Sequence, residues 1–302
     1  MLDVPGFLSP DCTSNNTCYR FIDPQYSSLY AWSSMGTSSY NGAQLALHQQ
    51  TVHGVQFDAY YTFSKSIDLG SDTERTGPTA TSFGGFSSQI INVYNPRGNR
   101  GPSDFDVHHA VTINAIGALP FGRGSLIGGN ANRLVDAFIG GWGLSGLTHW
   151  TSGLPFSGID GLGWNTDWAD QSWNVTTGPI PSGGHHPDSL GQPNAFPNQT
   201  GIASSSAALG NIRPPYAAET GNRNNYRGDG YFSIDTGLSK VFSITERQQV
   251  KFAAEMFNTT NSVRFDPATI NNDPWFGGST YGEYSALLTQ GRRMQMSLRY
   301  SF

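Results

Sequence analysis

The chain of 302 residues has no long apolar runs and few charges. No stretch approaches the roughly 18 consecutive apolar residues of a membrane-spanning helix. Only 13% of the residues are charged and the net charge is −5, so there is no basic footprint for nucleic acid. We therefore expect no helix to span a bilayer and no nucleic-acid partner.

Glycine and aromatic residues are abundant instead. The chain contains 37 glycines, and 13% of its residues are aromatic. Low charge with few aliphatic residues would indicate disorder, but disordered chains are depleted in aromatic rings. The combination is typical of a barrel with a polar interior, aromatic girdles and glycine-rich loops.

Apolar and polar residues alternate near the C-terminus. In residues 291–302 the even positions from Met294 to Phe302 are apolar and the odd positions are polar. A strand places each set on its own face, whereas a helix would scatter both sets. Similar patterns predict strands at 40–50, 55–64, 107–119, 142–150, 231–240 and 248–258, with a short one near 26–33.

These segments make about eight strands of roughly ten residues, the length that a tilted strand needs to cross a bilayer. We expect the apolar positions to face lipid and the polar positions to face the lumen. The positions expected to face lipid are Val55, Phe57, Tyr61, Val250, Phe252 and Leu298. The positions expected to face the lumen are Gln56, Asp58, Lys251, Glu255 and Arg299.

The connections between the predicted strands alternate in length. Residues 51–54 and 242–247 are short connections and 120–141 is intermediate, whereas 65–106, 151–230 and 259–290 are long. Short periplasmic turns and long extracellular loops are typical of outer-membrane barrels. The sequence thus predicts an all-β fold in the bacterial outer membrane: an antiparallel transmembrane β-barrel segment with long extracellular loops. We assign residues 1–25 to an N-terminal loop segment and 26–302 to the barrel.

The N-terminal region carries two further expectations. Residues 1–6 lack the basic and apolar regions of a secretory signal, so we interpret the chain as a fragment of a longer protein. Cys12 and Cys18 lie close together, and a disulfide between them would suit an extracytoplasmic compartment. Two unpaired thiols are the alternative.

Two histidine pairs could suggest a metal site. His108 and His109 lie where a strand begins, so their side chains should point to opposite faces and cannot chelate together. His185 and His186 lie in a loop without a cysteine or carboxylate at ligand spacing. We predict no metal site and no cofactor.

Catalytic residues are equally hard to propose. Asp104 and Asp106 could suggest a carboxylate pair for glycoside hydrolysis, but a loop end anchored by hydrogen bonds is the favoured interpretation. Ser39, Ser103 and Ser145 have no G-x-S-x-G turn around them. We predict no catalytic residue.

Three tryptophans, Trp164, Trp168 and Trp173, crowd the loop at 151–230. Such rings can stack on sugars or bind a partner. They can also form a small core within the loop itself, which is the favoured interpretation.

Eight segments carry a family resemblance: SSYNGAQL at 38–45, VQFDAYYTFSKS at 55–66, RGPSDFD at 100–106, LPFGRG at 119–124, GGW at 140–142, TERQ at 245–248, EMFN at 255–258 and YSF at 300–302. In this order and spacing, residues 24–302 resemble the C-terminal barrel of Oar-like TonB-dependent transporters. The resemblance implies uptake of a substrate through a barrel of about 22 strands. It also implies an N-terminal plug and barrel strands missing from this chain, with the TonB complex acting through that missing part.

The C-terminal run resembles the signal that the barrel assembly machinery reads, with Leu298, Tyr300 and Phe302 at alternate positions. Such recognition works by strand addition, in which pockets for alternate side chains give specificity. The alternative is that Phe302 is one more girdle aromatic.

Two other interpretations of the whole chain stay open at this point. The first is a complete small outer-membrane barrel with a structural or adhesive role. The second is a soluble all-β hydrolase that uses Asp104 or Asp106. Outer-membrane lipid is the partner expected for the first and for the transporter, but not for the second.

Overall fold

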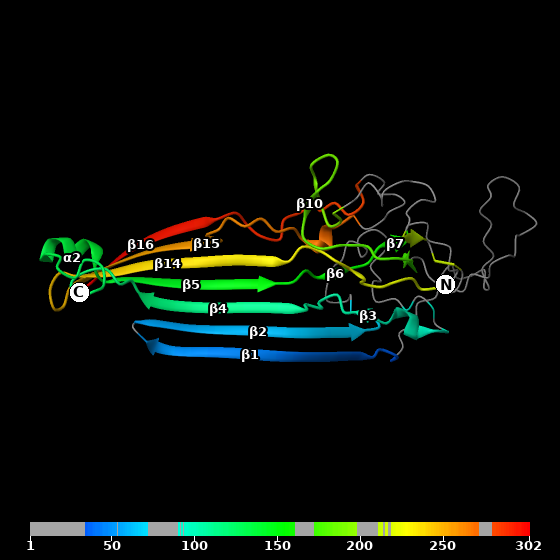
Figure 1. Ribbon diagram of the computed structural model, residues 1–302, viewed down its shortest axis with the longest axis horizontal. Coiled ribbons are helices and arrows are strands. Elements are labelled where there is room, and N and C mark those ends of the chain that lie inside the picture. The colour runs from blue at the N-terminus through cyan, green and yellow to red at the C-terminus, as the bar shows by residue number, and fades with distance from the viewer. Residues whose placement is uncertain are drawn as a thin grey trace, which may run out of the picture.

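A computed structural model describes residues 34–52, 54–71, 90, 92, 94–160, 172–197, 211–213, 215–216, 219–271 and 280–302. Its main feature is one antiparallel sheet in which strands adjacent in sequence are also adjacent in space (Figure 1). The long strands, in sheet order, are β1 (Ser38–Val52), β2 (Val55–Asp68), β4 (His109–Ala118), β5 (Trp142–Thr151), β14 (Tyr231–Ser243), β15 (Gln249–Phe257) and β16 (Arg293–Ser301).

These seven strands confirm seven of the predicted segments. A two-residue strand, β3 (Gly101–Pro102), also pairs with the end of β2. The strand expected near residues 26–33 lies outside the described residues. Its existence stays a prediction.

The register of the sheet places apolar residues opposite one another. Phe252 pairs with Leu298, Leu238 with Leu144, and Tyr61 with Leu45. Directly opposed residues share a face and pack against each other. The resulting apolar face comprises Ala43, Leu45, Leu47, Val55, Phe57, Ala59, Tyr61, Phe63, Val111, Ile113, Ala115, Trp142, Leu144, Trp150, Phe232, Ile234, Leu238, Phe242, Val250, Phe252, Ala254, Met256, Met294, Met296, Leu298 and Tyr300.

The opposite face is mainly polar, although it also holds Tyr60, Ile116 and Leu147. Its polar members include Gln44, His48, Gln56, Asp58, Thr112, Asn114, His149, Ser233, Asp235, Lys251, Glu255, Gln295 and Arg299. All eleven positions that the alternation assigned to lipid or lumen therefore lie on the expected face.

No other described part of the chain covers the apolar face. Leu298 is 72% exposed and Leu45 is 69% exposed. Contiguous apolar surface of this extent is rare on soluble proteins and marks a surface that contacts a membrane or another protein.

The connections fall at opposite ends of the sheet (Figure 1). Residues 53–54, 119–141 and 244–248 connect strands at one end, and Gly54 makes the tightest turn with a φ of 81°. Residues 69–108, 152–230 and 258–292 connect strands at the other end. The predicted alternation of short and long connections is confirmed.

A short helix, α2 (Arg133–Ile139), lies in the connection between β4 and β5, where we expected no regular element. The side chain of Asn132 accepts a hydrogen bond from the backbone N–H of Val135 at 2.9 Å and so caps its N-terminus. Gly140 ends the helix. No helix in the described parts of the chain is long and apolar enough to cross a membrane.

The described parts of the three long connections fold together into what we call the loop cap. Four two-stranded ladders brace it: β6 (Pro155–Phe156) with β13 (Tyr226–Arg227), β7 (Ile159–Asp160) with β8 (Ser172–Trp173), β9 (Val175–Thr176) with β12 (Ile212–Arg213), and β10 (His186–Pro187) with β11 (Pro193–Asn194). Two 3-10 turns, η1 (Pro96–Asn99) and η3 (Pro267–Thr269), complete it.

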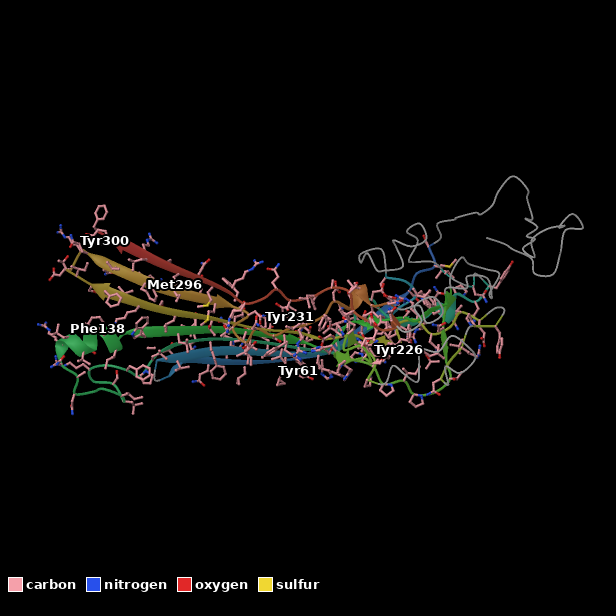
Figure 2. All side chains as sticks on the ribbon, turned by 90° about the horizontal axis from the view of Figure 1, so that it is seen from above. Tyr61, Phe138, Tyr226, Tyr231, Met296 and Tyr300 are labelled. Carbon is pink, nitrogen blue, oxygen red and sulfur yellow. The ribbon has the colours of Figure 1, made fainter. Side chains whose placement is uncertain are left out.

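The loop cap has a hydrophobic core of its own, formed by Phe156, Ala195, Phe196, Ile212, Tyr226, Ile270, Tyr281 and Tyr284. Tyr226 lies among the crowded side chains at this end of the molecule (Figure 2). The core expected from three tryptophans stays a prediction, because two of the three rings lie outside the described residues. Trp173 is half-buried in the β7–β8 ladder outside this cluster, and Trp164 and Trp168 lie outside the described residues.

The sheet has two edges within the described residues. There β1 pairs only with β2, and β16 pairs only with β15. Because seven is an odd number, β1 and β16 run in the same direction (Figure 1). These strands alone cannot close with an antiparallel pair, whereas bacterial barrels close with an even number of antiparallel strands.

Candidate functional site

Arg223 ties the end of β2 to the loop cap. Its Nη1 donates to Asp68 Oδ1 at 2.6 Å, and its Nη2 donates to Ser71 Oγ at 2.8 Å and Asp104 Oδ1 at 3.3 Å. The side chains of Arg223 and Asp68 are only 4% and 8% exposed. Removing one partner from such a buried pair leaves an uncompensated charge, so this contact fixes the cap on the strand end.

Arg227 makes a second tie, to the segment that precedes β4. It donates to the Asp106 carboxylate, to the Asp106 carbonyl oxygen at 2.6 Å and to His108 Nε2 at 2.8 Å. Asp106 is almost fully buried, and its Oδ1 also accepts from the Ser66 backbone N–H at 2.6 Å. Burial and the nearby Arg227 lower the pKa of His108 against the opposing effect of Asp106.

Asp229 makes a third tie, just before β14. Its Oδ2 lies 2.8 Å from His185 Nδ1 and accepts from the Phe265 backbone N–H at 3.1 Å. Its Oδ1 accepts from Arg264 Nη1 at 3.3 Å. Burial, and then the Asp229 charge, raise the pKa of Tyr284. The carboxylate thus joins three separate segments of the cap.

These contacts show what the two aspartates suspected of catalysis do. Asp104 and Asp106 lie in a turn rather than a strand, and different arginines bind them. The expectation of a loop end anchored by hydrogen bonds is confirmed for both. Ser103 Oγ contacts Ser66 Oγ at 2.8 Å, and Ser145 Oγ donates to the Gly237 carbonyl at 3.3 Å.

The histidine pairs are divided among separate contacts. While His108 contacts Arg227, His109 Nδ1 lies 2.8 Å from Tyr61 Oη. His185 contacts Asp229, while His186 Nε2 lies 3.0 Å from the Gly183 carbonyl. Across the part of the chain that is described, no three His, Cys, Asp or Glu residues cluster as metal ligands would.

Two hollows lie where the polar face of the sheet meets the loop cap. Their volumes are about 350 and 680 Å³, and both are lined by Tyr231, Ser233 and Asp235. The smaller also reaches His149 and the larger reaches Arg293, among other residues. Tyr231 lies between the strands and the cap in Figure 2. Rings, a carboxylate and a guanidinium together suit contact with a polar solute.

Sequence reasoning missed the residues that hold this junction together, namely Asp68, Arg223, Arg227, Asp229 and Arg264. Each lies far in sequence from most of its partners, so no local spacing connects them. The low number of charged residues was the available signal. In a chain with few charges, a charged residue within a glycine- and asparagine-rich loop is a candidate for a specific ion pair.

The predicted terminal residues lie on the last strand. The rings of Tyr300 and Phe302 stack with centroids 5.7 Å apart, and Phe302 is 93% exposed. Their role in assembly, with Leu298, stays a prediction. Cys12 and Cys18 lie outside the described residues, and their disulfide also stays a prediction.

An antiparallel meander with one apolar face, one polar face, short turns at one end and folded loops at the other defines an outer-membrane β-barrel protein. Residues 4–295 match the outer membrane beta barrel domain family. The chain belongs to this family and is located in the bacterial outer membrane, so the soluble interpretation is wrong. Searches of curated proteins and of solved structures found no match.

Proposed function

We propose that this chain forms the C-terminal wall of an Oar-like TonB-dependent transporter that takes up a substrate across the outer membrane. The observation that carries the proposal is the open sheet. The first and last of the seven described strands, β1 and β16, run in the same direction and cannot pair in an antiparallel manner. Their outer edges leave two rows of unpaired backbone groups, and each such group costs several kcal/mol of free energy in hydrocarbon. Further strands on both edges satisfy them in a larger barrel.

The polar face and the loop cap support transport over a purely structural role. The hollows lined by Tyr231, Ser233 and Asp235 open on the face that we assign to the lumen, directly below the cap. A solute that enters through the extracellular loops meets this surface first. We propose that the chain performs no catalysis and needs no cofactor, because its buried aspartates are bound by arginines.

The remaining partners follow from the same proposal. An upstream barrel segment supplies the strands next to β1 and β16, and a plug fills the lumen. The TonB complex acts through that plug, and the barrel assembly machinery inserts the whole protein.

The test compares the 302-residue chain with the longer gene product that the proposal requires. Each is exported to the outer membrane, then tested for crosslinking to the TonB protein and for heat-modifiable migration. We expect crosslinking and heat modification from the longer protein only, with the shorter chain aggregated or open. A heat-modifiable, protease-resistant monomer of the shorter chain would contradict the proposal and favour a complete small barrel.

A further inference from the structure

Lys240 is a cation on the apolar face of the sheet. It lies opposite Trp142 on β5 and opposite Phe252 on β15, so its side chain shares their face. The rings of Trp142 and Phe252 meet with centroids 6.0 Å apart although a strand separates them. The two rings therefore lean over Lys240, which is only 4% exposed.

The ammonium group of Lys240 lacks a hydrogen-bond acceptor among the described residues. It lies 4.9 Å from the Phe242 ring centroid and 5.4 Å from that of Trp142. Phe242 is nearer than Lys240 to the short connection, so the side chain extends toward the membrane surface. Lysines near the ends of membrane segments reach in this way for the headgroup region.

The helix α2 lies at the same end and is joined to this cluster. Trp142 Nε1 donates to the carbonyl oxygen of Phe138 at 2.9 Å. Leu134, Val135 and Phe138 share one side of the helix, and Leu134 and Phe138 are 77% and 75% exposed. Phe138 lies at the opposite end of the molecule from the cap residue Tyr226 (Figure 2).

We propose that α2, Trp142 and Lys240 form a docking surface for phospholipids of the periplasmic leaflet. Leu134 and Phe138 enter the boundary between headgroups and acyl chains. The Lys240 ammonium, which the rings of Trp142 and Phe252 cover, binds a lipid phosphate when these rings turn aside. Two observations select lipid as the occupant. The surface is continuous with the apolar face of the sheet. The Lys240 ammonium contacts two rings but has no hydrogen-bond acceptor among the described residues, so it complements an anionic headgroup. Amphipathic helices lie in membrane interfaces for the same reasons.

The first test measures membrane contact of α2 and leaves Lys240 unchanged. In the assembled protein with Cys12→Ser and Cys18→Ser, a nitroxide is attached at Phe138→Cys or, as the matched control, at the exposed Arg133→Cys on the other side of the helix. The vesicles contain phosphatidylethanolamine and phosphatidylglycerol. We expect oxygen to relax the label at 138 more than a water-soluble nickel chelate does, with the reverse order at 133. Equal exposure to the nickel chelate at both positions would overturn the proposal.

The second test measures lipid retention by native mass spectrometry after purification in detergent. Lys240→Gln should retain several-fold less phosphatidylglycerol, whereas Lys251→Gln, on the polar face of the neighbouring strand, should retain the normal amount. Excess inorganic phosphate should not displace the lipid. Equal retention in the two variants, or displacement by phosphate, would contradict a headgroup site at Lys240.

If Lys240→Gln does not assemble, Lys240→Arg should assemble and retain lipid; loss of lipid there would count against the proposal. Neither test depends on transport.

Discussion

The sheet and the loop cap place their apolar side chains in opposite environments. The cap buries its aromatic rings in a core, with Tyr226 and Phe196 each 1% exposed, and it pairs its buried carboxylates with arginines. The sheet turns its rings outward and leaves Met296 and Leu298 about 70% exposed, at 69% and 72%. The difference shows that one chain is built for two solvents: water around the cap and hydrocarbon around the sheet.

The largest expected effect is in the cap core. Phe196→Ala removes a ring that contacts Phe156, Tyr226 and Tyr281. Truncating a buried phenylalanine costs about 3–5 kcal/mol. Hydrogen exchange on the assembled protein should show this loss in the cap while exchange in the sheet stays unchanged. Leu190→Ala, at a 70% exposed cap position, is the control and should change little.

A slightly smaller effect is expected on the apolar face of the sheet. Leu298→Arg places a charge in the hydrocarbon region at a cost of about 2–4 kcal/mol, and Ser297→Arg on the polar face should cost far less. Denaturant titration of the assembled barrel measures both. Equal losses for the two variants would show that the apolar face does not meet lipid.

The stability of the cap should also depend on pH, through His108. Because the pKa of His108 is lowered in the folded protein, the unfolded chain binds the proton more readily below the ordinary value of 6.5. The stabilisation is complete above that value and declines as the pH falls. Proteolysis of the cap at about pH 5 and pH 7 should differ more in the native protein than in His108→Gln. Identical pH responses would exclude His108 as the source.

The smallest effect on stability is expected from deleting Phe302, which is 93% exposed. Its removal should slow assembly in cells and leave the unfolding free energy nearly unchanged. Pulse-labelling of the longer gene product follows the assembly rate. Normal assembly kinetics would leave Phe302 with only the role of a girdle aromatic.

The sequence predicted the sheet well because a half-buried strand carries its own period of two. Residues 55–64 and 291–302 showed that period clearly, and the structure has β2 and β16 there. It also indicated which face each position occupies. Lys240 received no face assignment because it is a charged residue at the end of the predicted strand 231–240. Its place on the apolar face follows only from its pairing with Trp142.

The cap was much less predictable, because its contacts join residues distant in sequence. Asp68 and Arg223 are 155 residues apart in sequence, and only the tertiary structure brings them into contact. The described part of the cap core consists mainly of phenylalanines and tyrosines from two connections, and no local sequence pattern links them. The helix α2 could have been predicted from the local sequence, since Asn132 precedes a short amphipathic run that ends at Gly140.

The central property of the sheet is that alternate residues of its long strands face lipid and lumen. A nitroxide scan of residues 293–300 on β16, in the assembled protein in phospholipid vesicles, tests this most directly. We predict that oxygen accessibility alternates, with maxima at Met294, Met296, Leu298 and Tyr300, and that accessibility to a nickel chelate peaks at the positions between them. Uniform accessibility along the strand, or maxima at the odd positions, would contradict the account.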